Sequence, residues 1–315
     1  MVRLCVLNLV VAGASEAHAD EAAEVVTEIA AHHPARAILL IADPTAGAGI
    51  AADLSLQCVI AAGAGQACVE TVRLRIGGDA ALHLRSVVPP LLLPDVPTHL
   101  WLHGPAPLDQ ALDADTLELC ERVVVDSEAY DDARATLRRL AVTPPRSDGS
   151  LPLSDLAWIR TRPWREQLAR AFDPPTHRAL LGGVARIDLV TDDGARTPPG
   201  ALLLAGWLLS RLRRDGSGTA PQVDIAPGGP GSRGRTGALR RLTLHCSSAG
   251  GQGTVSIERQ GEALRTSVEI DGGAEPVRAV PVEEPRLADL VGAALQETRG
   301  DAVFSDALRA AAALP

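Results

Sequence analysis

The chain of 315 residues contains no lysine, and all 30 of its basic residues are arginine. Schiff-base chemistry, a lysine general base and the P-loop lysine that contacts nucleotide phosphates are therefore excluded. The sequence also has no HExxH, CxxC or GxSxG motif, the spacings typical of zinc hydrolases, metal or dithiol sites and serine hydrolases. We therefore expect a protein that is not an enzyme, with no catalytic residue, metal or cofactor of its own.

Positive charge is scarce as well. The 39 acidic residues give a net charge of −9, so no global positive field attracts phosphate backbones, and nucleic acid is not an expected partner. The apolar stretch Leu202–Leu209 is far shorter than the ~20 residues of a membrane span. The apolar start of the chain resembles a secretory signal, but the run is short and Asn8 interrupts it, so a buried strand and a cytoplasmic location are predicted.

Cysteines are few and widely spaced. The five positions are an odd number and lie mostly in apolar runs, where free thiols are usually buried. This usage favours a reducing compartment, and a bridge between Cys58 and Cys68 is the minority alternative. The cysteines are Cys5, Cys58, Cys68, Cys120 and Cys246.

Strands and helices alternate in the first half of the sequence. Apolar strands at Leu4–Val11 and Arg36–Ala42 flank a helix at Glu16–Ala31, which predicts a βαβ unit. Shorter strands and helices continue this alternation to Leu140, so a mostly parallel, covered sheet is expected. Further strands are expected at Gln57–Ala62, Val69–Ile76, Thr98–Leu102 and Arg122–Asp126.

The length of the chain exceeds that of most single cores, so two domains are expected. Residues 1–175 are predicted to form an N-terminal, mostly parallel α/β sandwich that ends in a helical segment rich in tryptophan and arginine. Residues 176–315 are predicted to form an α+β domain with an antiparallel meander. The meander strands are expected at Leu239–Cys246, Gly253–Gln260 and Leu264–Asp271.

The segment Leu153–Phe172 concentrates tryptophan and arginine in a chain with only 2 % aromatic residues. These residue types dominate protein–protein hot spots, although an amphipathic helix that fills the core explains the tryptophans equally simply. Ser154 is expected to cap a helix and Pro163 to open a second one. In that second helix, Glu166 and Arg170 are expected to pair.

Two glycine-rich stretches could bind an anion. Gly47–Ala52 follows a predicted strand but lacks the third glycine of a dinucleotide loop, and Gly228–Arg235 has the composition of a solvated linker. An α/β protein that binds a nucleotide or sugar phosphate through one of these loops is therefore the alternative function.

A family resemblance emerges at the tryptophan-rich segment. Asp155-Leu156-Ala157-Trp158, followed by Pro163-Trp164-Arg165-Glu166, resembles the signature of the glucose-6-phosphate dehydrogenase assembly protein (OpcA) family. Further landmarks that resemble this family follow in order along nearly the whole chain. They are Arg3–Leu9, His33–Ala37, Leu92–Trp101, Val124–Ser127 and Leu204–Leu208.

The resemblance implies a cytoplasmic, non-catalytic protein that binds glucose-6-phosphate dehydrogenase and promotes its active oligomer. Such a protein supports NADPH production in the oxidative pentose phosphate pathway, and in some members cysteines couple this activity to redox control. Arginine pairs bidentately with carboxylates, and tryptophan anchors interfaces, so both types are candidates for contact with the dehydrogenase. The candidate partner-binding residues are Trp101, Trp158, Arg160, Arg162, Trp164 and Arg165.

Overall fold

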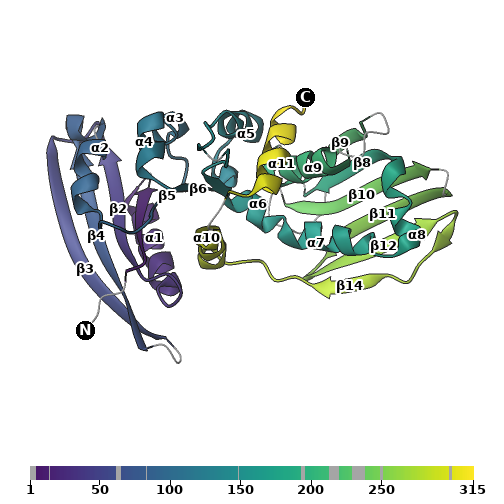
Figure 1. Ribbon diagram of the computed structural model, residues 1–315, viewed down its shortest axis with the longest axis horizontal. Helices are drawn as coiled ribbons and strands as arrows, with labels where there is room; N and C mark the ends of the chain where they lie inside the picture. Colours follow the sequence, from purple (N-terminus) through teal and green to yellow (C-terminus); the bar gives the residue numbers. More distant parts are fainter. Residues whose placement is uncertain are drawn as a thin grey trace. The chain divides into compact units, whose positions relative to one another are not determined.

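The computed structural model describes residues 5–13, 15–61, 65–82, 84–147, 149–192, 196–212, 220–228, 238–248, 251–297 and 300–315. The chain divides into two compact units, each assembled from separate segments (Figure 1). Unit 1 comprises Met1–Tyr130, Thr143–Leu156 and Pro285–Asp301. Unit 2 comprises Asp131–Val142, Ala157–Glu284 and Ala302–Pro315.

Unit 1 is built on a seven-stranded sheet of order β3-β4-β2-β1-β5-β6-β7. Its neighbouring strands are parallel except for the antiparallel pair β3–β4. The mostly parallel sheet expected from the sequence is thus confirmed. The strands are β1 (Leu7–Gly13), β2 (Ala35–Asp43), β3 (Gly49–Ala61), β4 (Gly65–Gly77), β5 (Thr98–His103), β6 (Arg122–Val125) and β7 (Leu153–Asp155).

The predicted βαβ unit forms the centre of this sheet. Leu7–Val11 is buried throughout, as expected for a strand covered on both faces, and β1 pairs with β2 in parallel. Helix α1 (Glu16–Ile29) begins at Ser15, whose side chain accepts a hydrogen bond from the His18 backbone N–H. One stripe of α1 is buried, and the helix also contacts α10 (Leu287–Gln296), which comes from the C-terminal part of the chain.

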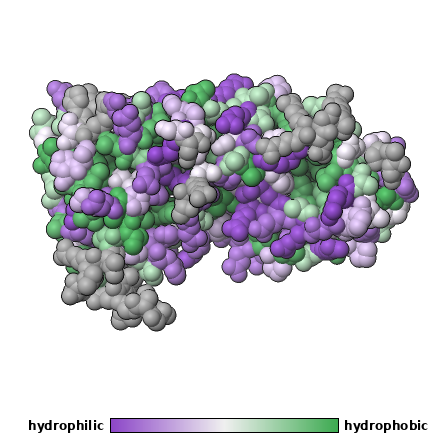
Figure 2. All heavy atoms as spheres, viewed as in Figure 1, coloured by the Kyte–Doolittle hydropathy of each residue, from purple (hydrophilic) through white to green (hydrophobic). Residues whose placement is uncertain are grey.

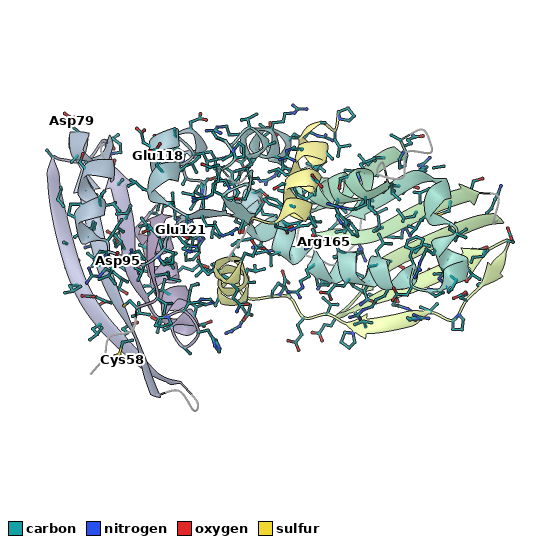
Figure 3. The ribbon with its side chains drawn as sticks, in the orientation of Figure 1. Cys58, Asp79, Asp95, Glu118, Glu121 and Arg165 are labelled. Atoms are coloured by element: carbon teal, nitrogen blue, oxygen red, sulfur yellow. A yellow bond between two sulfur atoms is a disulfide. The ribbon has the colours of Figure 1, made fainter. Side chains whose placement is uncertain are left out.

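The hairpin β3–β4 is longer than expected and carries a disulfide. Cys58 and Cys68 face each other across the two strands, with Cα atoms 4.0 Å apart, and their sulfur atoms are bonded (Figure 3). The minority alternative from the sequence is therefore the one that the structure contains. The first half of β3 was missed because Ala51–Ser55 is exposed and lacks the alternation of a half-buried strand.

Unit 2 contains a second sheet, of order β13-β12-β11-β10-β8-β9, with β14 paired to β12. The predicted meander is confirmed by the antiparallel ladders of β10 with β11 and β11 with β12. The short strand β9, parallel to β8, was not anticipated. The strands are β8 (Val184–Thr191), β9 (Gln222–Pro227), β10 (Leu239–Ser248), β11 (Gly251–Gln260), β12 (Ala263–Ile270), β13 (Gly273–Ala274) and β14 (Arg278–Pro281).

The core of unit 2 lies between one face of this sheet and helices α7 (Arg162–Ala171) and α9 (Pro199–Leu212). Ile187, Leu244 and Ile257 come from the strands, and Trp164 and Leu204 come from the helices. The opposite positions of the strands carry polar or charged side chains. Sheet and helices therefore bury one apolar face each.

Helix α9 packs closely on α11 (Ala302–Ala312), and a glycine makes this possible. A Cβ atom added to Gly206 would lie 2.2 Å from the Ala307 carbonyl oxygen and 2.6 Å from the Ala311 nitrogen. Only glycine allows the two backbones to come this near. No helix in the described part of the chain is long and apolar enough to cross a membrane.

The two units do not coincide with the expected cut after residue 175. Helix α5 (Ala133–Ala141) belongs to unit 2 and packs on α11, whereas α10 belongs to unit 1. Amphipathic periodicity reveals that a helix has an apolar face, but it does not reveal which distant segment covers that face. A boundary inferred from sequence order alone could not detect this interleaving.

Local contacts around the tryptophan-rich segment also differ from expectation. Ser154 is not a helix cap, because it lies inside the short strand β7, and α6 (Leu156–Arg160) follows directly. Pro163 does open α7, as predicted. Glu166 pairs with Arg162, whose Nε lies 2.8 Å from the carboxylate, and not with Arg170.

Candidate functional site

The tryptophan-rich segment of unit 2 is largely a core element. Trp158 and Trp164 are buried, and the Trp158 ring lies 5.8 Å from the ring of Phe304. The Arg165 guanidinium stacks 3.6 Å above the Trp158 ring and projects from the start of α7 (Figure 3). Arg162, with 69 % of its side chain exposed, is the most accessible of the predicted partner-binding residues.

Trp101, the remaining tryptophan of the predicted set, lies in unit 1. It is fully buried in β5, and its ring is tilted against His103 with centroids 4.7 Å apart. Its indole N–H has no hydrogen-bond partner among the described residues. All three tryptophans are therefore buried, and among the predicted partner-binding residues only the arginines are partly or fully exposed.

The carboxyl ends of β1 and β5 mark the place where an open α/β sheet of this type usually binds its ligand. The chain passes from β1 to β2 on one side, and β5 pairs on the other side of β1, so the direction of winding reverses between β1 and β5. A dinucleotide loop here would read GxGxxG. This chain has Gly13, Ser15 and His18 at the three positions, so two of the three glycines are absent.

Side chains of unit 1 fill this carboxyl edge, which we define by Ser15, His18, Glu21, His103 and Gly104. The Ser15 hydroxyl lies 2.8 Å from His18 Nδ1, and the rings of His18 and His103 meet edge to face at 5.1 Å. A Cβ atom on Gly104 would lie 2.8 Å from His18 Nε2. The helix end that would receive a pyrophosphate is therefore capped by Ser15 and covered by an imidazole.

Electrostatics at the carboxyl edge favour a neutral His103 ring. Burial lowers the pKa of His103, although Glu21, whose carboxylate oxygen lies 3.0 Å from His103 Nε2, opposes that shift. A neutral His103 ring provides no attraction for a phosphate group. Among the described residues, His18 and His103 occupy the space that a nucleotide would need at this edge.

The first glycine-rich loop does not supply a substitute site. Gly47 lies just before strand β3 and Gly49 is its first residue, so no helix N-terminus follows the two glycines. The carboxylate of Asp43, at the end of β2, accepts hydrogen bonds from the backbone N–H and hydroxyl of Thr45, and these bonds lower its pKa. The second loop, Gly228–Arg235, lies outside the described residues apart from Gly228.

A buried polar cluster at the opposite end of the unit 1 sheet has a structural role. Arg122 Nη1 donates to the Ser154 hydroxyl at 2.9 Å and to Glu297 at 3.1 Å, which fastens the end of α10 to β6 and β7. His99 lies beside Arg122 in the ladder, and burial lowers its pKa to about 4. Within the described residues, no group of three or more His, Cys, Asp or Glu side chains could hold a metal ion.

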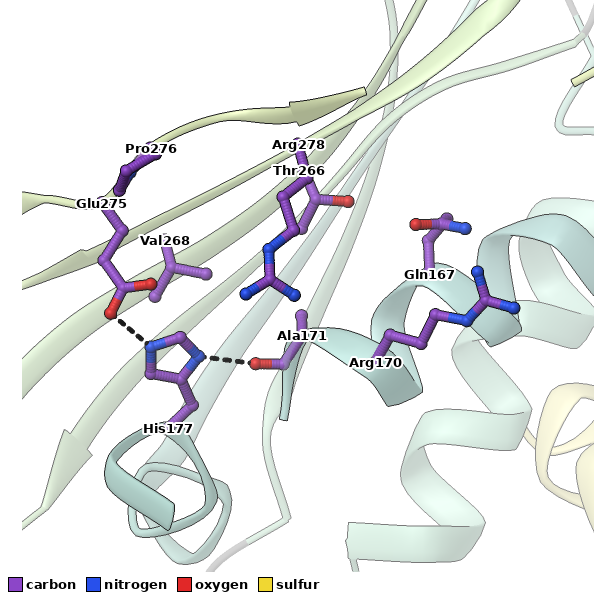
Figure 4. A pocket seen from close by; sticks show the side chains of 9 residues that line it. All are labelled: Gln167, Arg170, Ala171, His177, Thr266, Val268, Glu275, Pro276 and Arg278. Carbon is purple, nitrogen blue, oxygen red and sulfur yellow. Dashed lines mark hydrogen bonds and ion pairs between the residues drawn. The ribbon is translucent and has the colours of Figure 1, made fainter. Parts of the chain in front are cut away.

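An open pocket lies in unit 2, between α7 and strands β12 and β14 (Figure 4). His177, which is 2 % exposed, forms one wall. Its Nδ1 lies 2.6 Å from the Ala171 carbonyl oxygen and its Nε2 lies 2.7 Å from the Glu275 carboxylate. Because both partners are acceptors, both ring nitrogens donate when both bonds form.

No pattern in the sequence predicted this pocket. Its residues are spread from α7 to β14, and His177 and Glu275 are 98 positions apart in the chain. In contrast, the three residues Gly13, Ser15 and His18 directly follow the first predicted strand, and comparison with GxGxxG at that place would have revealed the altered loop. The lining residues of the pocket are Gln167, Arg170, Ala171, His177, Thr266, Val268, Glu275, Pro276 and Arg278.

Comparisons with known proteins agree with the resemblance in the sequence. Residues 26–142 match the glucose-6-phosphate dehydrogenase subunit N-terminal domain, and residues 151–308 match the corresponding C-terminal domain. The OxPP cycle protein OpcA of Synechocystis sp. is 30 % identical over 195 residues, which cover 61 % of this chain and 40 % of that protein. The OpcA protein of Synechococcus elongatus is 32 % identical over 188 residues, or 58 % of this chain and 41 % of that protein.

The matched region thus spans about two fifths of the length of these curated relatives. Among solved structures, glucose-6-phosphate 1-dehydrogenase from Mycobacterium avium aligns with 97 % of this chain and 90 % of its own, at 11 % identity and a TM-score of 0.47. The two domain matches together cover most of the chain, from residue 26 to residue 308. The chain belongs to the OpcA family of glucose-6-phosphate dehydrogenase assembly proteins.

Proposed function

We propose that this protein is a non-catalytic assembly factor that binds glucose-6-phosphate dehydrogenase and promotes its active oligomer. In this role it supports NADPH production in the oxidative pentose phosphate pathway. The observation that carries the proposal is the carboxyl edge of unit 1, where His18 and His103 take the place of a nucleotide. The filled edge supports a role through a partner rather than through a bound nucleotide.

The exposed arginines of unit 2 are the proposed contact with that partner. Arg162 lies at the start of α7 with its guanidinium held by Glu166, which keeps the donor groups oriented toward solvent. Arg160 and Arg165 are half-buried neighbours on the same segment. These three arginines can pair with carboxylates on an acidic surface of the dehydrogenase. The buried side chains of Trp158 and Trp164 pack in the core of the same segment.

A direct experiment measures the activity and oligomeric state of the dehydrogenase from the same organism with and without the purified protein. We expect higher activity together with a larger oligomer in light scattering. A charge reversal, Arg162→Glu, should weaken the association about tenfold, whereas Arg265→Glu, on the exposed face of β12, should leave it unchanged. A dehydrogenase that neither associates with the protein nor changes its activity contradicts the proposal.

The same preparation tests the alternative function, a nucleotide- or sugar-phosphate-binding protein that uses a glycine-rich loop. If the protein has no nucleotide site, NADP should leave the melting temperature of the isolated chain unchanged. A ligand that does bind would, at 100 times its Kd, stabilise the fold by about 2.7 kcal/mol and raise the melting temperature. Turnover of a substrate by the pure protein would also contradict the non-catalytic role.

A further inference from the structure

The open pocket of unit 2 has the chemistry of an anion site. Arg170 and Arg278 both line it, and neither has a hydrogen-bond or ion-pair partner among the described residues (Figure 4). Two unpaired guanidiniums at one pocket indicate a negatively charged ligand.

A buried hydroxyl in the same pocket points to a ligand independently. Thr266 occupies a position of β12 that faces the core, between Leu264 and Val268, where the alternation of the strand calls for an apolar residue. It is 6 % exposed, and its Oγ1 has no hydrogen-bond partner. A buried hydroxyl without a partner is costly, and a ligand oxygen in the pocket would satisfy it.

The polar groups of the pocket come from three elements: helix α7 and strands β12 and β14. Arg278 of β14 stands directly opposite Thr266 in the ladder, and its guanidinium extends toward the end of α7 (Figure 4). Gln167 and Arg170 come from successive turns of α7, and the Gln167 side chain is buried at the pocket. The hydrogen bond between His177 and Glu275 holds the neighbouring wall of the pocket in place. The Glu275 carboxylate points toward His177 (Figure 4).

We propose that this pocket, defined by Gln167, Arg170, Thr266 and Arg278, binds the phosphate group of a small phosphate ester. A tetrahedral dianion offers enough acceptor oxygens for two guanidiniums, an amide and a hydroxyl at the same time, whereas a carboxylate has only two oxygens. The overall charge of −9 gives no general attraction for anions, so binding depends on these local donors. The site does not depend on the proposed dehydrogenase partner.

Isothermal titration of the full chain at constant ionic strength tests the proposal, with inorganic phosphate, glucose 6-phosphate and acetate as separate probes. Inorganic phosphate is expected to bind, glucose 6-phosphate at least as tightly, and acetate more weakly. Equal or tighter binding of acetate would overturn the assignment of a phosphate and leave a carboxylate site. Binding of inorganic phosphate without glucose 6-phosphate would overturn the assignment of an ester.

Variants locate the site. Arg278→Gln and Arg170→Gln should each weaken phosphate binding about tenfold or more, because each removes a charged donor. Thr266→Val, which keeps the shape of the side chain, should weaken binding by a smaller factor and raise the melting temperature of the free protein. Arg162→Gln, on the same helix but outside the pocket, is the matched control and should bind as the wild type does. Unchanged phosphate binding in both arginine variants would refute the proposal.

Discussion

The candidate ligand sites of the two units differ: the one in unit 1 is filled by side chains, and the one in unit 2 is open. In unit 1 the sheet topology predicts a crevice at the ends of β1 and β5, and Ser15, His18 and His103 fill it. In unit 2 no such rule applies to an antiparallel meander, yet a pocket with unpaired arginines is open there. Figure 2 shows hydrophilic residues gathered over β14, beside this pocket.

Topology thus indicates where a site can be, while side chains decide whether it exists. Two residues in one short loop, Ser15 and His18, stand where a dinucleotide loop has glycines, and His103 of the neighbouring strand packs against His18. In the other sheet, one core-facing hydroxyl and two nearby arginines form a candidate site. Four experiments test this difference between the units.

The largest effect is expected from Trp164→Ala, which removes a large side chain from the core of unit 2. Trp164 is buried in the cluster between α7 and the unit 2 sheet, so its truncation should cost about 3–5 kcal/mol of unfolding free energy. Chemical denaturation measures this loss, and Arg162→Ala on the exposed side of α7 is the control. An unchanged midpoint combined with lost activation of the dehydrogenase would instead make Trp164 a contact residue.

Acid should weaken unit 1 before unit 2. Burial holds the pKa of His99 at about 4, below its ordinary 6.5, so between these values the unfolded chain binds a proton that the folded chain does not. Stability is therefore full above pH 6.5 and falls as the pH drops toward 4, by up to about 3 kcal/mol.

Hydrogen exchange followed by mass spectrometry between pH 7 and 4.5 resolves the two units. Amides of β5 and β6 should lose protection first, and His99→Leu should flatten this dependence. Equal loss of protection in both units would show that the pH response does not arise at His99.

A smaller effect is expected when the filled carboxyl edge is crowded further. Gly104 has a φ of +81°, and an added methyl group would meet His18, so Gly104→Ala should cost about 1–3 kcal/mol. Gly149→Ala is a matched control, because its φ is +80° but nothing lies within 4 Å of the added atom. Thermal melting should show the larger loss at Gly104, and His18→Ala should recover part of it. Equal losses at both glycines would mean that His18 exerts no steric constraint.

The smallest effect is expected from reduction of the Cys58–Cys68 bridge. The bridge joins two strands that already pair along the whole of β3 and β4, so the reduced chain gains little freedom. We expect a loss below about 2 kcal/mol, confined to exchange of the β3–β4 amides. The Cys58→Ser variant should match the reduced wild type. Cooperative unfolding of unit 1 on reduction would contradict this expectation.

Much of the fold could be predicted because its central strands are long and apolar. Periodicity located β1, α1 and β2, and alternation with intervening turns located the three meander strands. The edge strand β3 was predicted too short, and the three-residue strand β7 was not predicted. Both are defined by pairing with a neighbouring strand and not by a pattern of polar and apolar residues of their own.

The candidate sites were less predictable, for a related reason. Tryptophan and arginine drew attention to α6 and α7, but composition could not show that Trp158 and Trp164 would be buried while Arg162 would reach solvent. Thr266 becomes noteworthy only when its place on the core face of β12 is known. The contacts that define each site join residues far apart in the chain, which periodicity does not encode.

The interleaving of the two units has a consequence for synthesis on the ribosome. The last helices, α10 and α11, complete unit 1 and unit 2 respectively. Neither core can therefore form fully until nearly the entire chain has left the ribosomal exit tunnel. A nascent chain carrying either half alone would expose apolar strands to the crowded cytosol and depend on chaperones. Expression of the two halves as separate genes should accordingly give insoluble products that regain solubility only when they are produced together.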